Sequence, residues 1–241
     1  MIVLLTDFGH GEYAGVMKGV IYSISGNAKI VDLCHDISPQ NTIEGSWILK
    51  SNYKYFPKGS TFCCVVDPGV GTERKAIAVK TADYYFVAPD NGLLFETLGE
   101  QTIIDMRDIP IGEDASSTFH GRDVFAGAAA RIDSGDFEFP PGKIEEIERL
   151  EFYRDERVGM VVRIDRFGNV ITNLPGQNKS VYSVRVRQRD LRMNFRTTYN
   201  AAEEDELFLI EGSCSTLEIS LKNGNANEKL RVEAGMKIEI S

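Results

Sequence analysis

The chain of 241 residues is poor in several features that would point to particular classes of protein. No apolar run approaches the ~20 residues that a membrane-spanning helix requires, and the initial MIVLLTDF lacks the basic region and cleavage site of a signal peptide. Its four cysteines, Cys34, Cys63, Cys64 and Cys214, form no C-x-x-C pair. We therefore expect no structural zinc, no disulfide framework, and a reducing cytoplasm as the location.

Histidine is also scarce, with three in the chain, and the acids and histidines lack close ligand spacing such as H-x-x-x-H. This pattern predicts no metal site. Cys63 and Cys64 are adjacent on one predicted strand, so their side chains should point to opposite faces of a sheet.

Acidic residues outnumber basic ones, which gives a net charge of -9. Residues 1–150 carry 13 Lys and Arg against 22 Asp and Glu, whereas residues 151–241 are balanced at 14 against 14. Such a chain has no electrostatic footprint for nucleic acid or for an anionic membrane. In the arginine-rich VRVRQRDLRMNFR, Arg185, Arg187 and Arg189 have the period of a half-buried strand with a solvated face, and we interpret them so.

The first half alternates short apolar strands with amphipathic helical stretches, which predicts a three-layer α/β domain with a largely parallel sheet. Ligands of such sheets bind beyond the carboxyl ends of the strands. Three strand candidates end in an acid there, namely Asp7, Asp67 and Asp90. The strand candidates are 2–8, 29–35, 61–67, 76–82, 84–90 and 103–108, and the helical ones 12–25, 41–56, 92–99 and 122–134.

The second half has a different texture. Pro140, Pro141 and Gly142 interrupt the last long helical pattern, and a charged connector follows. Beyond about residue 155 the helical patterns stop, and short strands separated by Gly and Asn turns predict a small β-barrel or sandwich. We place an α/β domain at 1–152 and a β-barrel-like domain at 153–241.

The segment LLTDFGHGEYAGVMKGV resembles a dinucleotide-binding loop, because Gly9, Gly11 and Gly15 follow a strand and precede a helix. However, the carboxylates of Asp7 and Glu12 would repel a pyrophosphate. One carboxylate can instead accept both hydroxyl protons of a ribose diol, which would suit Asp7. A strand-end acid that caps the next helix is the alternative.

Three further motifs carry candidate functional groups. In VVDPGVGTERKAI, a tight turn would bring Arg74 within reach of Asp67, as a structural or a catalytic ion pair. In STFHGRDVFAGAAARI, His120 lies in a loop before a helix and is a candidate acid, base or donor, with a structural histidine as the alternative. In RIDRFGNVITN, an aromatic ring beside Asp165 and Asn169 could recognise a base, or the segment could be a plain turn.

Five motifs in this order, TDFG, DPGVGTER, APDNGLL, TFHGRDVFAG and IDRFGNVITN, resemble the S-adenosylmethionine hydroxide adenosyltransferase family, whose relatives include the fluorinase and chlorinase. The resemblance runs from about residue 2 to the carboxyl terminus. It implies cleavage of S-adenosylmethionine at C5′ of the ribose by water, which gives adenosine and L-methionine without a cofactor. It also implies a homotrimer, with sites between the amino-terminal domain of one subunit and the carboxy-terminal domain of its neighbour.

The resemblance also assigns roles to residues. Asp67, Arg74 and His120 match the proposed catalytic trio. Cys214 stands where halogenating relatives have an arginine. The substrate-binding matches are Asp7 for the ribose hydroxyls with Phe8 beside it, Asp165 for the amino-acid end, Phe167 and Asn169 for the adenosyl part, Ser213 for the methionine moiety, and Asn225 and Ala226 near the adenine.

Several alternatives stay open at this point. Asp67 could accept the proton of water, or Arg74 and His120 could stabilise hydroxide. A carboxylate would repel a halide in a small desolvated site, so the retained Asp, Arg and His favour water over a halogenating reaction. A methyltransferase would give S-adenosylhomocysteine, and a non-catalytic nucleoside-binding protein would use the trio as structural ion pairs.

Overall fold

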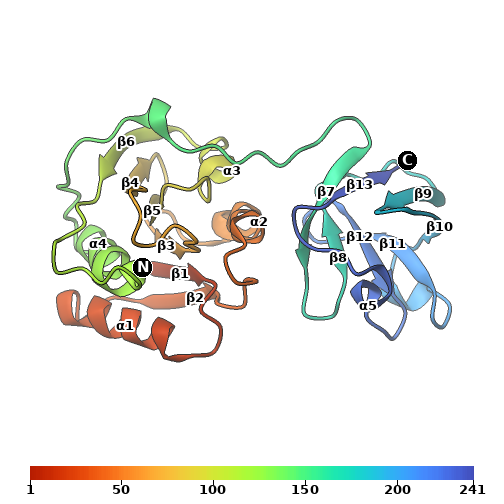
Figure 1. The fold of residues 1–241 in the computed structure, drawn as a ribbon, viewed down its shortest axis with the longest axis horizontal. Coiled ribbons are helices and arrows are strands. Elements are labelled where there is room, and N and C mark those ends of the chain that lie inside the picture. The colour runs from red at the N-terminus through yellow and green to blue at the C-terminus, as the bar shows by residue number, and fades with distance from the viewer. The chain divides into compact units, whose positions relative to one another are not determined.

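The computed structural model describes residues 1–241, which form two compact units, Met1–Glu151 and Phe152–Ser241 (Figure 1). The first is a layered α/β unit and the second a closed β-barrel, so the expected fold class is confirmed. None of the helices combines the length and the apolar character needed to cross a membrane.

A six-stranded sheet in the order β2-β1-β3-β5-β4-β6 forms the centre of the first unit. The pairs β1–β2, β1–β3 and β3–β5 are parallel, and only β4 runs against its neighbours. The sheet is therefore largely parallel, as predicted. The strands are β1 (Ile2–Thr6), β2 (Ile30–Cys34), β3 (Thr61–Val65), β4 (Ala76–Thr81), β5 (Tyr85–Pro89) and β6 (Ile103–Asp108).

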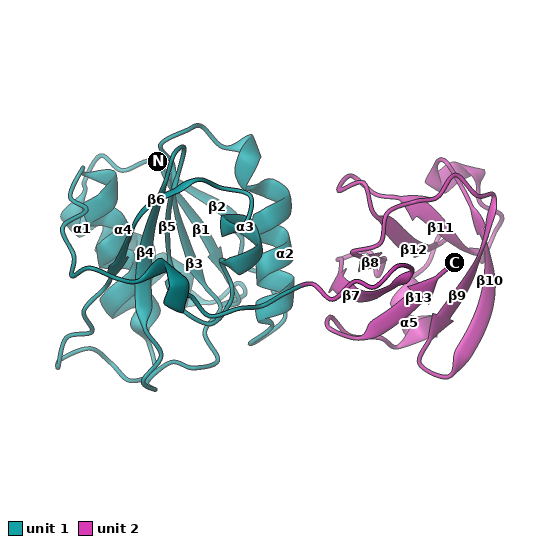
Figure 2. Ribbon diagram, turned by 90° about the horizontal axis from the view of Figure 1, so that it is seen from above, with its two compact units in different colours: residues 1–151 teal, residues 152–241 magenta.

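Helices cover both faces of this sheet, with α1 and α4 on one side and α2 and α3 on the other (Figure 2). Because side chains alternate along a strand, Ile2 packs into the core under α1 and α4, and Val3 into the core under α2. Cys63 and Cys64 face opposite cores, as predicted, and burial raises the pKa of the Cys63 thiol to about 12. The helices are α1 (Glu12–Ile24), α2 (Thr42–Asn52), α3 (Phe95–Leu98), α4 (Ala126–Asp133), a π-turn at Gly121–Phe125, and 3₁₀ turns at Tyr53–Tyr55 and Ile144–Glu146.

The second unit closes seven strands into a barrel in the order β10-β11-β12-β8-β7-β13-β9. Its interior is apolar and includes Val161, Leu209 and Ile219. The elements are β7 (Val158–Ile164), β8 (Val170–Thr172), β9 (Val181–Val186), β10 (Arg189–Phe195), a 3₁₀ turn (Tyr199–Ala201), β11 (Leu207–Glu211), β12 (Leu217–Leu221), α5 (Ala226–Leu230) and β13 (Lys237–Ile240).

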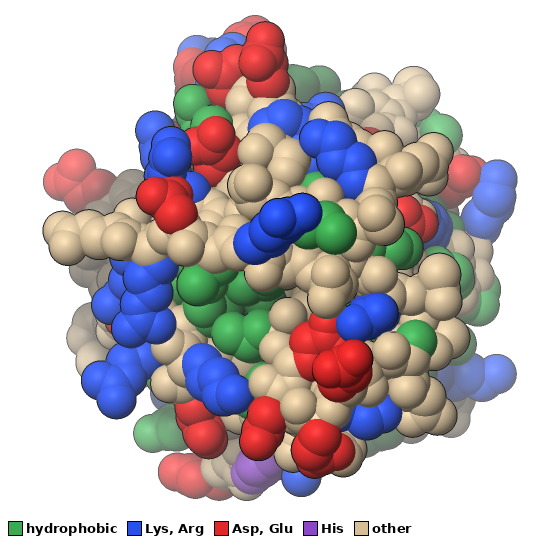
Figure 3. Space-filling model, turned by 90° about the vertical axis from the view of Figure 1, so that its right-hand side faces the viewer, with side chains coloured by type: hydrophobic (Ala, Val, Ile, Leu, Met, Phe, Trp, Pro, Cys, Tyr) green, Lys and Arg blue, Asp and Glu red, His purple; other side chains and the backbone are tan.

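The arginine-rich segment is a hairpin, so the interpretation of Arg185, Arg187 and Arg189 as one alternating row was wrong. Arg187 has a positive φ of 55° in the turn between β9 and β10. Arg185 is solvated as expected, and it pairs with Asp190 at 2.7 Å and with Glu239 at 3.2 Å. Figure 3, which faces this end of the chain, shows acidic side chains among the basic ones.

A short helix also lies where no helix was expected. In α5, the Asn225 side chain caps the first turn by accepting a hydrogen bond from the Glu228 amide at 3.0 Å. Arg231 ends the helix with a φ of 55°. Five residues are too few to produce a helical period in the sequence.

Candidate active site

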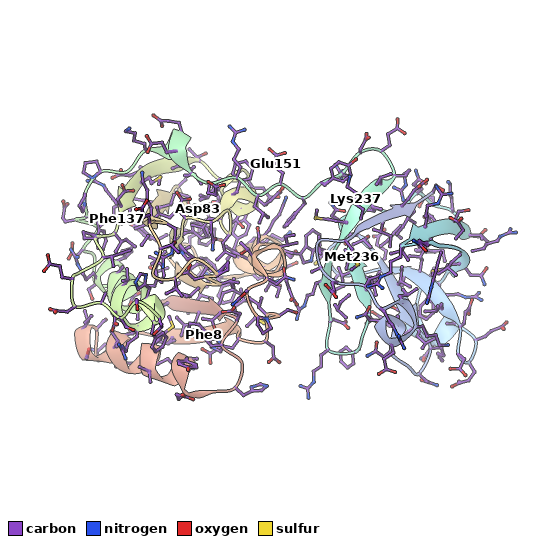
Figure 4. All side chains as sticks on the ribbon, in the orientation of Figure 1. Phe8, Asp83, Phe137, Glu151, Met236 and Lys237 are labelled. Atoms are coloured by element: carbon purple, nitrogen blue, oxygen red, sulfur yellow. The ribbon has the colours of Figure 1, made fainter.

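The carboxyl ends of β1 and β3 meet at one edge of the parallel sheet, where the first unit has a cavity of about 300 Å³. Asp7 and Asp67 both line it, as their positions after two strands suggested. Asp90 follows β5 but accepts a hydrogen bond from the Glu148 amide at 2.9 Å and does not line the cavity. Other lining residues are Phe8 (labelled in Figure 4), Gln40, Phe119 and His120.

Arg74 connects Asp67 with His120. Its Nε lies 3.0 and 3.1 Å from the two Asp67 carboxylate oxygens, and its Nη2 contacts the same carboxylate and lies 2.7 Å from His120 Nδ1. A guanidinium can only donate, so His120 Nδ1 accepts, and the neutral ring carries its proton on Nε2. The side chains of Arg74 and Asp67 are 8% and 7% exposed, so this charge pair is shielded from water.

The environment of His120 favours the neutral imidazole. Burial lowers its pKa, and the positive charge of Arg74 lowers it further. His120 precedes the π-turn Gly121–Phe125, which opens α4. π-turns within helices are frequent at functional sites. The Arg74 guanidinium lies over the Phe125 ring, with Cζ 5.2 Å from the ring centroid, so this turn also packs against the bridging cation.

A glycine brings the loops that carry Asp67 and His120 together. Gly71 has a φ of 77°, and a Cβ on it would lie 2.3 Å from the Ser117 carbonyl oxygen. Only glycine permits both the conformation and the close approach. The turn after Asp67 therefore lies against the loop that precedes His120, and the Thr72 hydroxyl closes that turn by donating to the Gly69 carbonyl at 2.7 Å.

Asp7 is held at the cavity wall by a backbone group. Its Oδ2 accepts a hydrogen bond of 2.7 Å from the Gln40 amide, and Gln40 has a left-handed φ of 64°. Burial raises the pKa of Asp7, the nearby charge of Asp67 adds to this, and the Gln40 hydrogen bond opposes it. The neighbouring Phe8 ring packs on Gly121, where a Cβ would come within 3.1 Å of its Cζ.

The second unit has a hollow of about 590 Å³ beside the RFGN turn, lined by Asp165, Phe167, Asn169 and Tyr199, among others. Asp165 organises this turn. Its Oδ1 accepts hydrogen bonds from the amides of Phe167 and Asn169, and its Oδ2 accepts one from the Asn169 side chain, all at 2.9 Å. Phe167 is left 76% exposed. Two aromatic rings with amide groups form a surface that can stack and hydrogen-bond a planar base.

The other predicted binding residues of this unit differ in burial and in whether they lie near the RFGN turn. Asn225 lies against the RFGN turn, because a Cβ on Gly168 would be 2.0 Å from Asn225 Oδ1. Ala226 is fully buried in the barrel core, backbone included, so it presents no surface to a ligand in this unit. Asn225 lines a second hollow, which it shares with Gly168 and Arg231. Ser213 is exposed and lines neither this second hollow nor the one beside the RFGN turn.

Sequence reasoning missed Gln40 and Tyr199. Gln40 acts through its backbone amide, which no side-chain pattern reveals. Tyr199 lies in the polar segment RTTYNAAEED, and its hydroxyl donates to Glu218 Oε2 at 3.3 Å. Burial and the charge of Asp165 raise the pKa of Glu218. No group of three or more His, Cys, Asp or Glu side chains is arranged to hold a metal ion.

Comparison with known proteins places both units in one family. The models of the SAM hydroxide adenosyltransferase N-terminal and C-terminal domains match residues 2–140 and 159–239. The chain belongs to this family. The resemblance inferred from the five sequence motifs is thereby confirmed.

Individual relatives cover the whole chain. An (R)-S-adenosyl-L-methionine hydrolase of Methanocaldococcus jannaschii is 37% identical over all of this chain and 95% of that protein. The crystal structure of an uncharacterized conserved protein from Thermotoga maritima is 36% identical, with a TM-score of 0.90 and full coverage of both chains. A fluorinase of Nocardia brasiliensis is 27% identical over 72% of this chain and 71% of its own.

The contact between Arg74 and His120 predicts that substitution of Arg74 changes the pKa of His120. In Arg74→Met the cation that depresses the His120 pKa is gone while Asp67 remains, so the pKa of His120 should rise. NMR titration of the imidazole measures it. Arg74→Lys keeps the charge and should give a smaller rise. An unchanged or lower His120 pKa in Arg74→Met would contradict the geometry.

Proposed function

We propose that this chain is a hydrolase that cleaves S-adenosyl-L-methionine at ribose C5′ with water, giving adenosine and L-methionine. The observation that carries the proposal is the buried Asp67–Arg74–His120 network beside a cavity that Asp7 also lines. Relatives named (R)-S-adenosyl-L-methionine hydrolase support it. Because of that name, we propose the (R) configuration at sulfur as the preferred substrate.

The chemistry asks for orientation more than for acid catalysis. The water oxygen forms a bond to C5′ while the C5′–S bond breaks, and its electron pair stays on sulfur as the neutral thioether of methionine. A sulfonium needs no protonation to leave, so we propose that no cofactor takes part. Holding water in line with the C5′–S bond can supply much of the rate enhancement.

We propose a role for each member of the network. His120 carries its proton on Nε2 and donates a hydrogen bond from it to the water oxygen, which orients the water for attack while the proton stays on the ring. Asp67 accepts the proton that water loses and releases it to solvent, so the reaction yields one proton per turnover. Arg74 keeps both groups in register through hydrogen bonds to each.

The remaining residues hold the substrate. Asp7 accepts the hydroxyl protons of the ribose, with Phe8 beside it. In the second unit, Phe167 and Tyr199 stack on the adenine and Asn169 bonds its edge. Further roles carried over from the family are Asp165 and Ser213 toward the amino-acid end, and Asn225 and Ala226 near the adenine.

A halide is a poor nucleophile for this cavity. Asp7 and Asp67 both line it, and like charges in a partly desolvated site repel strongly. Halogenation is therefore the less supported alternative. A non-catalytic nucleoside-binding protein is the other, and it would bind adenosine without converting S-adenosylmethionine.

The test is incubation with each sulfur epimer of S-adenosylmethionine in H₂¹⁸O with EDTA, with and without chloride, followed by mass spectrometry. We expect ¹⁸O in the 5′-hydroxyl of adenosine, faster turnover of the (R) epimer, and no chlorinated nucleoside. Asp67→Asn and His120→Ala should lower kcat by about a hundredfold or more. Asp90→Asn is the matched control, since this acid lies at the same sheet edge but bonds the Glu148 amide.

Some outcomes would overturn this function. S-adenosylhomocysteine as product would indicate a methyltransferase, and a chlorinated nucleoside a halogenase. Full activity in both Asp67→Asn and His120→Ala would remove the proposed network from the chemistry. Binding without any product would leave a nucleoside-binding protein.

We also propose a cytoplasmic homotrimer in which each substrate contacts two subunits, on the strength of the family resemblance. Asp67→Asn and Phe167→Ala disable residues of different units, so co-expression of the two variants should restore activity above that of either alone. Sedimentation should give the mass of three chains, and cell fractionation should place the protein in the cytoplasm. Monomers, or no restoration in mixed oligomers, would contradict a shared site.

A further inference from the structure

A second histidine, His35, contacts the loop that follows β1 and carries Asp7. The strands β1 and β2 lie side by side and run parallel (Figure 1). Their register shifts between Leu4, which pairs with Asp32, and Leu5, which pairs with Cys34. The extra residue advances β2 by one position, so that His35 comes level with Thr6, the residue before Asp7. Bulges of this kind are frequent beside active sites, where they re-aim a side chain.

His35 holds the loop after β1 by two hydrogen bonds. Its Nδ1 lies 2.7 Å from the hydroxyl oxygen of the fully buried Thr6, and that oxygen also accepts the Phe8 amide at 3.2 Å. The backbone carbonyl of His35 accepts a hydrogen bond of 2.7 Å from the Gly9 amide, and Gly9 turns the chain with a φ of 64°. The bonds flank Asp7 on both sides along the chain.

The histidine is itself anchored from the outer edge of the sheet. His35 Nε2 lies 3.1 Å from Asp32 Oδ1, although the atoms are not aligned as a hydrogen bond. Asp32 in turn accepts a hydrogen bond of 2.6 Å from Lys18 of α1. The loop is thereby tied to both the edge strand and the helix that follows it.

We propose that His35 is a positioning residue that, through Thr6 and the Gly9 amide, sets the Asp7 carboxylate for recognition of the ribose diol. The inference rests on the proposed function, in which Asp7 binds that diol. Gln40 bonds the carboxylate itself, whereas His35 fixes the backbone that carries it. The cavity is lined by Asp7 and Phe8 but not by His35, so the histidine acts through the loop and not on the substrate.

This role makes a distinct kinetic prediction. His35→Ala should raise KM for S-adenosylmethionine and reduce the preference for it over its 2′-deoxy analogue by about tenfold or more, since a misplaced carboxylate loses a charge-assisted hydrogen bond. The turnover number should stay within about threefold, because Asp67, Arg74 and His120 keep their contacts. Asp7→Asn should lose the same preference.

Conservative variants separate positioning from folding. His35→Asn places an amide near the position of Nδ1, so it should restore most of the preference for the 2′-hydroxyl. Thr6→Val keeps the shape of the buried side chain but removes the bridging hydroxyl, so it should show the same loss of preference. It replaces His35→Ala as the test if the His35→Ala variant does not fold. His10→Ala is the matched control, because His10 lies in the same loop, is 90% exposed and pairs only with Asp36.

Calorimetry with adenosine and 2′-deoxyadenosine gives a readout that needs no turnover. If His35→Ala and Thr6→Val keep the wild-type ratio of the two affinities, the positioning role is wrong. A fall in kcat with an unchanged ratio would likewise show a purely structural role. Wild-type protein that distinguishes the two nucleosides but releases no adenosine would overturn the hydrolase and leave the role of His35 standing.

Discussion

The guanidinium of Arg74 is the group on which the candidate active site depends. It bonds the carboxylate of Asp67 and the ring of His120 together, and both lie in loops that are far apart in sequence. Because it can only donate, it also dictates the tautomer of His120. Gly71 and the Phe125 ring complete the support, since one allows the loops to approach and the other packs against the cation.

The parallel sheet explains why Asp7 and Asp67 line one cavity. β1 and β3 are neighbours, so the residues that follow them emerge at the same edge. Asp67 follows β3, and Asp7 follows β1. His35, the residue after β2, bonds Thr6, and the Gln40 amide bonds Asp7. The barrel unit contributes a different chemistry, with exposed aromatic and amide groups held by the Asp165 turn. The cavity of the first unit is therefore lined by carboxylates, and the hollow of the second by exposed aromatic and amide groups.

Much of this could be predicted from sequence, because the relevant signals are local. Strands ending in Asp7 and Asp67, and the glycine-rich turns between Asp67 and Arg74, follow from residue type and spacing. Other features depend on the backbone or on partners distant in sequence. Gln40 contributes an amide, and Tyr199 meets Glu218 only after β12 is paired beside β11. The turn at Arg187 contains no glycine or asparagine, so the alternation of the arginines concealed it.

The candidate site residues fall into two groups, according to how the sequence predicted them. Asp67 and His120, predicted from motifs that contain glycine, both line the cavity of the first unit. Those that match the family at isolated positions, such as Ser213 and Ala226, lie outside the hollow beside the RFGN turn.

The central claim is that the Asp67–Arg74–His120 network directs one water molecule in line at C5′. S-adenosylmethionine that carries a single deuterium of known configuration at C5′ tests this most directly, with the configuration of the product adenosine determined by NMR. In-line attack by one water molecule predicts inversion at C5′. Retention would show two successive displacements through a covalent intermediate and would contradict it.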